Sequence, residues 1–149
     1  GNSKYASGTV ASFITCLIYI YFYNLNVNII FLIFGLVIIA IYSVYSIDAF
    51  KNSFLELDAK EIVIDEFIGQ SIPVLTIYFF LDSNNVGFFI LYTFVSFILF
   101  RLFDIWKPYP IGKIDRNIKN GFGVILDDIV AGIYSIIIII VLFFFYNYV

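Results

Sequence analysis

Nearly all the charged residues of this chain can lie at one face of a lipid bilayer, and this arrangement constrains the fold more than any other feature. All eight Lys and Arg residues and ten of the eleven Asp and Glu residues fall at the N-terminus or in and beside two polar segments, 48–66 and 104–128. Only Asp82 falls elsewhere. Charged residues make up 13% of the sequence and hydrophobic residues 62%, whereas a soluble domain carries about 25% charged residues. The chain is therefore predicted to lie in a membrane, with its polar surface on one side.

Five apolar runs predict five helices that cross the membrane. A helical span needs roughly 17–25 residues, and the predicted helices are 9–23, 29–47, 67–81, 86–103 and 125–146. The third run is short and holds Pro73, so we expect it to be kinked or to begin within the polar segment before it. The connectors 24–28 and 82–85 are short and Asn-rich, which suits turns between antiparallel helices. We predict an all-α polytopic membrane helical bundle of about five spans, forming one domain over residues 1–149.

The number of spans determines which segments share a side of the membrane. With five spans, the N-terminus and both long polar segments lie on one side, and the two short turns and the C-terminus lie on the other. The first side would carry every basic residue: Lys4, Lys51, Lys60, Arg101, Lys107, Lys113, Arg116 and Lys119. Because Lys and Arg are enriched in cytoplasmic segments of membrane proteins, we expect the polar segments to face the cytoplasm.

Two pairs of adjacent carboxylates stand at predicted helix starts. Asp65 and Glu66 lead into the third span, and Asp127 and Asp128 open the last. One interpretation is a charged cap, because the positive end of the helix dipole favours acidic side chains. The other is a set of hard oxygen ligands for Mg²⁺, which prefers carboxylates and water. The first pair by itself does not decide between these two interpretations.

A mixed segment of cations and one acid follows the fourth predicted span. Arg101 and Asp104 are three residues apart and share a helix face, and Lys107 continues that face if the helix persists. A salt bridge and a snorkelling Arg would explain the pattern, but two nearby prolines stiffen the exit, which suits a fixed group that binds phosphate. Asp115 and Arg116 lie farther along, either as partners of such a site or as loop charges.

Small polar residues and glycines stand at two of the helix starts on the same side. Thr9 and Ser12 open the first span, where hydroxyls are usually helix caps but could instead hold a phosphate. Gly121 and Gly123 precede the last span, and glycines allow backbone amides to approach an anion closely. The acids that follow would repel a bare phosphate, and a divalent cation removes that conflict by binding both groups.

The chain contains no histidine. This absence excludes histidine nucleophiles, histidine general bases and the commonest zinc ligand. The single cysteine, Cys16, lies in an apolar run, and we interpret it as a packing residue. Carboxylates assisted by a metal ion are therefore the chemistry that the sequence favours.

At this point the motifs resemble those of phosphatidylglycerophosphatase A, a bacterial family of membrane phosphatases. The similar stretches are 7–12, 61–70, 100–115 and 121–132, the last reading Gly-Phe-Gly-Val-Ile-Leu-Asp-Asp-Ile-Val-Ala-Gly. The first stretch departs from the family pattern, with Ser7 where the family tends to have Pro and Ala11 where it tends to have Gly. The resemblance implies Mg²⁺-dependent hydrolysis of phosphatidylglycerophosphate to phosphatidylglycerol and phosphate. It also implies a multi-pass protein of the bacterial inner membrane with its active site facing the cytoplasm.

The resemblance assigns expected roles to individual residues. The family's acidic positions are matched by Asp65, Glu66, Asp104, Asp127 and Asp128, and its basic position by Lys107. We predict that Asp65, Glu66, Asp127 and Asp128 hold one or two Mg²⁺ ions, with Asp104 as a ligand or a base. Lys107, with Arg101 or Arg116, would offset charge on the phosphoryl oxygens. The predicted substrate-binding residues are Thr9, Ser12, Asp115, Gly121 and Gly123. Attack by water and formation of an aspartyl phosphate both stay open, as does the oligomeric state, and no nucleic-acid partner is expected.

Other functions are weighed by motif and by charge. A CDP-alcohol phosphotransferase would show Asp-Gly-x-x-Ala-Arg followed by Gly-x-x-x-Asp-x-x-x-Asp, and this chain has neither. Lipid phosphatases of the phosphatidic acid type 2 class require His. A small cation transporter or channel with acidic mouths predicts ionisable groups near the bilayer midplane, whereas the predicted spans are almost free of charge along their lengths. Transport is kept as the alternative to a lipid phosphatase.

Overall fold

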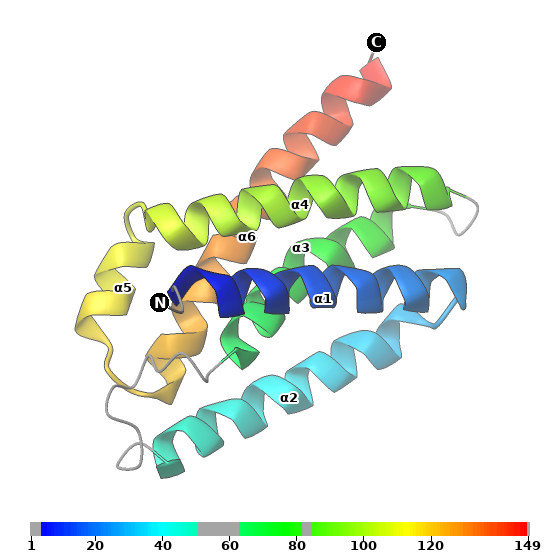
Figure 1. The fold of residues 1–149 in the computed structure, drawn as a ribbon. Coiled ribbons are helices and arrows are strands. Elements are labelled where there is room, and N and C mark those ends of the chain that lie inside the picture. The colour runs from blue at the N-terminus through cyan, green and yellow to red at the C-terminus, as the bar shows by residue number, and fades with distance from the viewer. Residues whose placement is uncertain (1–3, 51–62, 82–84, 149) are drawn as a thin grey trace.

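The computed structural model describes residues 4–50, 63–81 and 85–148, and all the regular secondary structure in these ranges is helical (Figure 1). The helices are α1 (Lys4–Asn24), α2 (Ile29–Phe50), α3 (Ile64–Phe80), α4 (Val86–Trp106), α5 (Ile111–Asn117) and α6 (Gly121–Tyr148). The prediction of an all-α protein is confirmed. Of the expected surface charges, Lys51, Lys60 and Asp82 lie outside the described residues, as does the side chain of Lys4.

All five apolar runs form helices, and three of these begin earlier than the apolar runs: α1 at Lys4, α3 at Ile64 and α6 at Gly121. Helix α3 begins at Ile64, so Asp65 and Glu66 lie in its first turn. Helix α6 begins at Gly121, so Asp127 and Asp128 lie in its second turn. Acidic side chains are favoured near a helix N-terminus, which lets each helix extend through its polar residues into the acidic end of the bundle.

The short helix α5 was not expected from the polar character of its sequence. It follows Pro110, whose carbonyl oxygen accepts hydrogen bonds from the amides of Lys113 (2.9 Å) and Ile114 (3.0 Å). Its one fully buried side chain, Ile111, packs in a cluster with Phe100 and Ala131. Burial of this single apolar side chain against α4 and α6 therefore holds a polar segment in helical form.

Three helices are long and apolar enough to cross a membrane, over Ile29–Ala49, Val86–Trp106 and Gly121–Phe145. Helix α3 has 17 residues and continues through the buried Pro73. The outer faces of the bundle carry many large apolar side chains, including Phe31 at 72% exposure. Exposed apolar side chains in such number indicate contact with lipid or with another protein. The count of five spans stays a prediction.

Consecutive long helices run in opposite directions, and their polar ends gather at one end of the bundle (Figure 1). Helix α1 packs on α3 and α4, helix α2 packs on α3 and α6, and α6 crosses the others and packs most extensively on α3. The opposite end is held by aromatic packing, with the rings of Tyr23 and Phe89 stacked at 3.9 Å. There the hydroxyl of Tyr78 donates to the carbonyl of Val27 at 2.6 Å.

The backbones of α3 and α6 touch directly at two glycines. A Cβ atom on Gly132 would lie 2.6 Å from the carbonyl oxygen of Gly69, and one on Gly69 would lie 2.8 Å from the carbonyl oxygen of Asp128. Real Cβ atoms essentially never make contacts this short. Small residues at a helix interface allow this approach. The contact places the first turn of α3 beside the acidic turn of α6.

A buried polar pair ties α3 to α4 one turn below Glu66. The side-chain amide of Gln70 donates to Ser96 Oγ at 3.0 Å, and both side chains are fully buried. Ser96 in turn donates to the carbonyl of Thr93 at 2.7 Å. Polar side chains inside an apolar bundle are retained when they hydrogen-bond one another, so this pair sets the register of α3 against α4 close to the acidic end.

Candidate functional site

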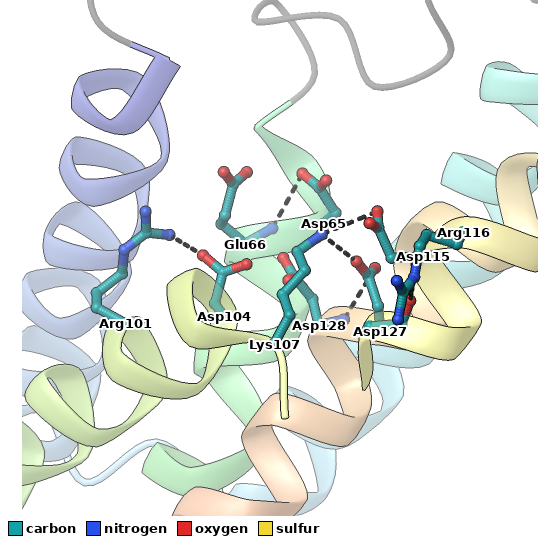
Figure 2. Close-up of polar contacts among 10 residues, drawn as sticks. Asp65, Glu66, Arg101, Asp104, Lys107, Asp115, Arg116, Asp127 and Asp128 are labelled. Carbon is teal, nitrogen blue, oxygen red and sulfur yellow. Dashed lines mark hydrogen bonds and ion pairs between the residues drawn. The ribbon is translucent and has the colours of Figure 1, made fainter. Parts of the chain in front are cut away.

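Three carboxylates from two helices converge at the polar end of the bundle. Asp65, Glu66 and Asp128 each present an oxygen atom, and these atoms all lie within 4.8 Å of one another (Figure 2). Asp65 is 8% exposed and Asp128 is 4% exposed. Glu66 Oε2 and Asp128 Oδ2 are buried and have no hydrogen-bond partner among the described residues. We refer to Asp65, Glu66 and Asp128 as the acidic triad.

The acidic triad is costly unless something offsets its charge. Burial raises the pKa of the Asp65 carboxyl well above its usual range, and the neighbouring Glu66 carboxylate raises it further. Burying a neutral polar group without a hydrogen-bond partner costs roughly 2–7 kcal/mol, and burying an unpaired carboxylate costs more. Hard divalent cations bind clustered carboxylate oxygens. The donor set and the two unpartnered oxygens therefore fit a cation such as Mg²⁺.

The adjacent acids of α6 point to different partners. Asp128 belongs to the acidic triad, whereas Asp127 Oδ2 accepts from Lys107 Nζ at 2.8 Å (Figure 2). Neighbouring residues on a helix are about 100° apart around its axis, because there are 3.6 residues per turn. Asp127 and Asp128, which the sequence analysis groups as one pair of metal ligands, therefore have different partners in the structure. A role for Asp127 as a metal ligand stays a prediction.

Lys107 joins three elements at the edge of the site. It ends α4 in the left-handed conformation, with φ 46°, which is uncommon for a residue other than glycine. Its Nζ atom lies 2.9 Å from Asp115 Oδ1 of α5 as well as 2.8 Å from Asp127 Oδ2 of α6. Burial by itself would lower the pKa of Lys107, but the two carboxylates raise it above its ordinary value. Lys107 is therefore a permanent positive charge beside the acidic triad.

Arg101 and Asp104 form an ion pair on the opposite side of the acidic triad (Figure 2). Their atoms Nη1 and Oδ2 are 2.6 Å apart, and both side chains are largely buried. The Nε atom of Arg101 is buried without a partner among the described residues, so this N–H group could donate a hydrogen bond to a ligand. Arg116 is exposed, and its Nε donates to the Gly112 carbonyl at 2.7 Å. The predicted helix face shared by Arg101 and Asp104 is present.

The groups predicted to bind phosphate hold other partners in this structure. The hydroxyl of Ser12 is buried and donates to the carbonyl of Gly8 at 2.9 Å. The Gly121 amide donates to Asp48 Oδ1 at 2.7 Å. The Gly123 amide donates to an oxygen of Asn120 at 2.8 Å. Thr9 is half-buried in α1. Substrate binding by these residues stays a prediction.

Two residues of this region were missed in the sequence. Asp48 links the end of α2 to the start of α6 through its bond to Gly121. Asn120 precedes α6 and caps the amide of Gly123. Asn is among the strongest helix N-caps, so the Asn-Gly step at 120–121 was a readable signal for an earlier helix start. The contact of Asp48 with α6 depends on tertiary structure and had no local signal.

A family model and two named relatives match this chain under one description. A family model described as "Phosphatidylglycerophosphatase A" matches residues 1–143. Proteins of that name from Escherichia coli strain K12 and Haemophilus influenzae are 41% identical over 78 residues and 40% identical over 81 residues. Those alignments cover 52% and 54% of this chain, and 41% and 45% of the relatives, so the matched part spans less than half of each relative.

A third relative aligns over nearly the whole chain. It is a Bacteroides thetaiotaomicron protein provisionally named as a phosphatidylinositol-3-phosphatase, and it is 32% identical over 141 residues. The alignment covers 93% of this chain and 84% of that protein. No solved structure matches the chain.

Proposed function

This chain belongs to the phosphatidylglycerophosphatase A family, and we propose that it hydrolyses the terminal phosphate of phosphatidylglycerophosphate to leave phosphatidylglycerol. The observation that carries the proposal is the acidic triad, with two buried carboxylate oxygens that lack partners. Cations flank the triad on both sides, Arg101 on one and Lys107 on the other. A site of alternating acids and cations suits a phosphate that carries its own negative charge.

Asp65, Glu66 and Asp128 are the residues that would hold Mg²⁺. Bound Mg²⁺ polarises a phosphoryl group and lowers the pKa of a coordinated water. A carboxylate-only donor set matches the preference of that ion. Asp127 lies one residue from the triad, but its carboxylate is engaged by Lys107, so we assign it to holding Lys107 in place.

The flanking residues would bind and orient the phosphoryl group. Lys107 keeps its proton throughout the physiological range, because its two carboxylate partners raise its pKa. It can offset negative charge that builds on the phosphoryl oxygens in the transition state. Arg101 would donate a hydrogen bond from its unpartnered Nε to a phosphoryl oxygen. Asp104 lies between these cations (Figure 2) and is the candidate to accept a proton from the attacking water.

We infer the membrane arrangement from the position of the site. The acidic triad lies at the end of the bundle where α3 and α6 begin, so five crossings would place it at the level of the lipid headgroups (Figure 1). Acyl chains would stay in the bilayer while the terminal phosphate reaches the acids. Excess Lys and Arg on this side favours a cytoplasmic orientation.

A second lipid phosphate is a competing substrate. The relative that aligns over 93% of this chain is provisionally named as a phosphatidylinositol-3-phosphatase, and phosphatidylinositol 3-phosphate is also a phosphate monoester on a lipid headgroup. Cation transport is less favoured, because the described spans carry Asp, Glu, Lys and Arg only near the polar end.

The test is phosphate release by the purified protein in detergent micelles from each of the two lipids. We expect release from phosphatidylglycerophosphate with Mg²⁺, loss of release with EDTA, and recovery when Mg²⁺ is restored. Faster phosphate release from phosphatidylinositol 3-phosphate would mean that this lipid is the substrate, while the proposed reaction, hydrolysis of a phosphate monoester, would still hold. Activity that survives complete chelation would exclude a metal-dependent mechanism. No phosphate release from either lipid would favour the alternative function, cation transport.

A further inference from the structure

Helix α1 meets the acidic triad at a glycine. A Cβ atom built on Gly8 would overlap Glu66 Oε1, and it would lie 2.9 Å from Glu66 Cδ and 3.1 Å from Arg101 Nη1. Gly8 is buried in α1, and Figure 2 shows Glu66 and Arg101 on the side of the site nearest that helix. The space that a side chain at position 8 would fill is therefore occupied by the Glu66 carboxylate and bordered by the Arg101 guanidinium.

We propose that Gly8 is a positioning residue, whose missing side chain leaves the space in which the Glu66 carboxylate joins Asp65 and Asp128. The inference rests on the proposed function, because it concerns the placement of a carboxylate toward a divalent cation. Gly8 itself touches no substrate. It acts through Glu66, and through Arg101 to a lesser degree because that contact is longer.

The neighbours of Gly8 decide what a larger residue would disturb. At Gly69 and Gly132 a Cβ atom would strike backbone oxygen atoms, which cannot move without separating two helices. At Gly8 it would strike the ends of two flexible side chains. An added methyl group would therefore displace the Glu66 carboxylate while α1, α3 and α4 keep their places.

Three further points agree with a role in the site. Glu66 Oε2 is buried without a partner among the described residues, so the carboxylate that Gly8 accommodates is one of the two in the acidic triad that are open to a ligand. Gly in a helix is less stable than Ala, so α1 would gain helix stability from Ala at this position. The Ser12 hydroxyl, which donates to the Gly8 carbonyl at 2.9 Å, braces the same turn.

The experiment measures Mn²⁺ binding to purified protein in detergent micelles by electron paramagnetic resonance, with Mn²⁺ as the probe of the cation site. Gly8→Ala is compared with Gly35→Ala and Gly87→Ala, two glycines with nothing within 4 Å of an added Cβ atom. We expect Gly8→Ala to weaken Mn²⁺ binding about tenfold, as loss of support for a ligand typically does, with an unfolding temperature close to that of the controls. The two control variants should bind Mn²⁺ like the wild type.

A second pair of variants tests whether the effect passes through Glu66. Glu66→Asp withdraws the carboxylate by one methylene group and leaves room for the methyl group of Ala. In that background, Gly8→Ala should change Mn²⁺ affinity by no more than about twofold, because two changes that share one contact are not additive. An equal loss in both backgrounds would overturn the inference, since the effect would then not depend on the reach of Glu66.

The remaining outcomes are also decisive. Wild-type Mn²⁺ affinity in Gly8→Ala would overturn the inference, and so would a Gly8→Ala protein that fails to fold. A wild-type protein that binds Mn²⁺ but releases no phosphate from either lipid would overturn the proposed function alone. A wild-type protein that binds no Mn²⁺ would overturn both.

Discussion

Lys107 Nζ lies 2.8 Å from Asp127 Oδ2, and this contact ties the end of α4 to the second turn of α6. The Asp127 carboxylate is largely buried, with 8% of its side chain exposed. Asp115 of α5 contacts the same ammonium group at 2.9 Å. One lysine therefore forms ion pairs with two acids beside the acidic triad and connects three helices, α4, α5 and α6.

Replacement of Lys107 by Met should reduce both stability and activity. The change leaves the Asp127 carboxylate buried without its cation, and leaving a buried polar group without its partner costs roughly 1–3 kcal/mol. Activity should fall further than stability explains, because the positive charge beside the phosphate is lost. Thermal unfolding and phosphate release measure the two effects. The matched control is Lys113→Met, since Lys113 is exposed. Equal unfolding temperatures for the two variants would contradict the structural role of Lys107.

A double variant separates the two roles of Lys107. With Lys107→Met and Asp127→Asn together, no charge is left unpaired between these two positions, so we expect stability to recover by about 1 kcal/mol or more relative to Lys107→Met alone. Activity should not recover, because the cation is still absent. Recovery of phosphate release would show that Lys107 serves only to neutralise Asp127.

The acids should differ in their effect on metal binding. Asp65→Asn and Asp128→Asn each remove a charged oxygen donor from the acidic triad, and we expect each to lower activity by about 100-fold or more and to weaken Mn²⁺ binding. Asp127→Asn should weaken Mn²⁺ binding much less, because that carboxylate faces Lys107. Titration of Mn²⁺ into the three purified variants ranks their Mn²⁺ affinities. If Asp127→Asn proves as damaging to binding as Asp128→Asn, Asp127 belongs among the ligands.

Replacement of Gly132 by Ala should destabilise the bundle. The new Cβ atom would lie 2.6 Å from the backbone oxygen of Gly69, so α3 and α6 must move apart. Overpacking of this kind costs typically about 1–3 kcal/mol. Gly35→Ala, which meets nothing within 4 Å, should leave stability within about 0.5 kcal/mol or raise it. Thermal unfolding in the same detergent compares them. Identical melting curves would show that the two helices tolerate separation.

The metal-free protein should become more stable as the pH falls. Burial and the Glu66 carboxylate raise the pKa of Asp65 in the folded state, so the folded protein binds more protons than the unfolded chain above the ordinary Asp pKa of about 3.9. Stability then decreases as the pH rises from that value through the raised pKa. Unfolding temperatures in EDTA at several pH values measure the slope. Asp65→Asn should flatten the dependence, and an unchanged slope in that variant would assign the effect to other acids.

Several features of the fold were readable because they depend on local sequence. Apolar runs form helices in a membrane because every backbone amide and carbonyl must be satisfied within the segment, and all five predicted runs are helical. Helix α3 begins within the polar segment, which is one of the two alternatives expected for it. The starts of α1 and α6 were placed too late, because the prediction followed apolar residues and, for α6, gave too little weight to the Asn cap at 120. Helix α5 depends on the burial of Ile111 between α4 and α6, which has no local signature.

The sequence by itself determined that the chain is helical and apolar, that its acids and cations collect at helix ends, and that histidine chemistry is absent. Only the tertiary structure decided how those ends combine. It placed Asp128 with Asp65 and Glu66 but turned Asp127 toward Lys107, and it set Gly8 against the Glu66 carboxylate. The physical reason is that helix formation is a local property of the backbone, whereas these contacts depend on the rotation and separation of helices. Close packing at glycines and at buried side chains sets the rotation and the separation of the helices. The residues that pack together in this way lie far apart in the sequence.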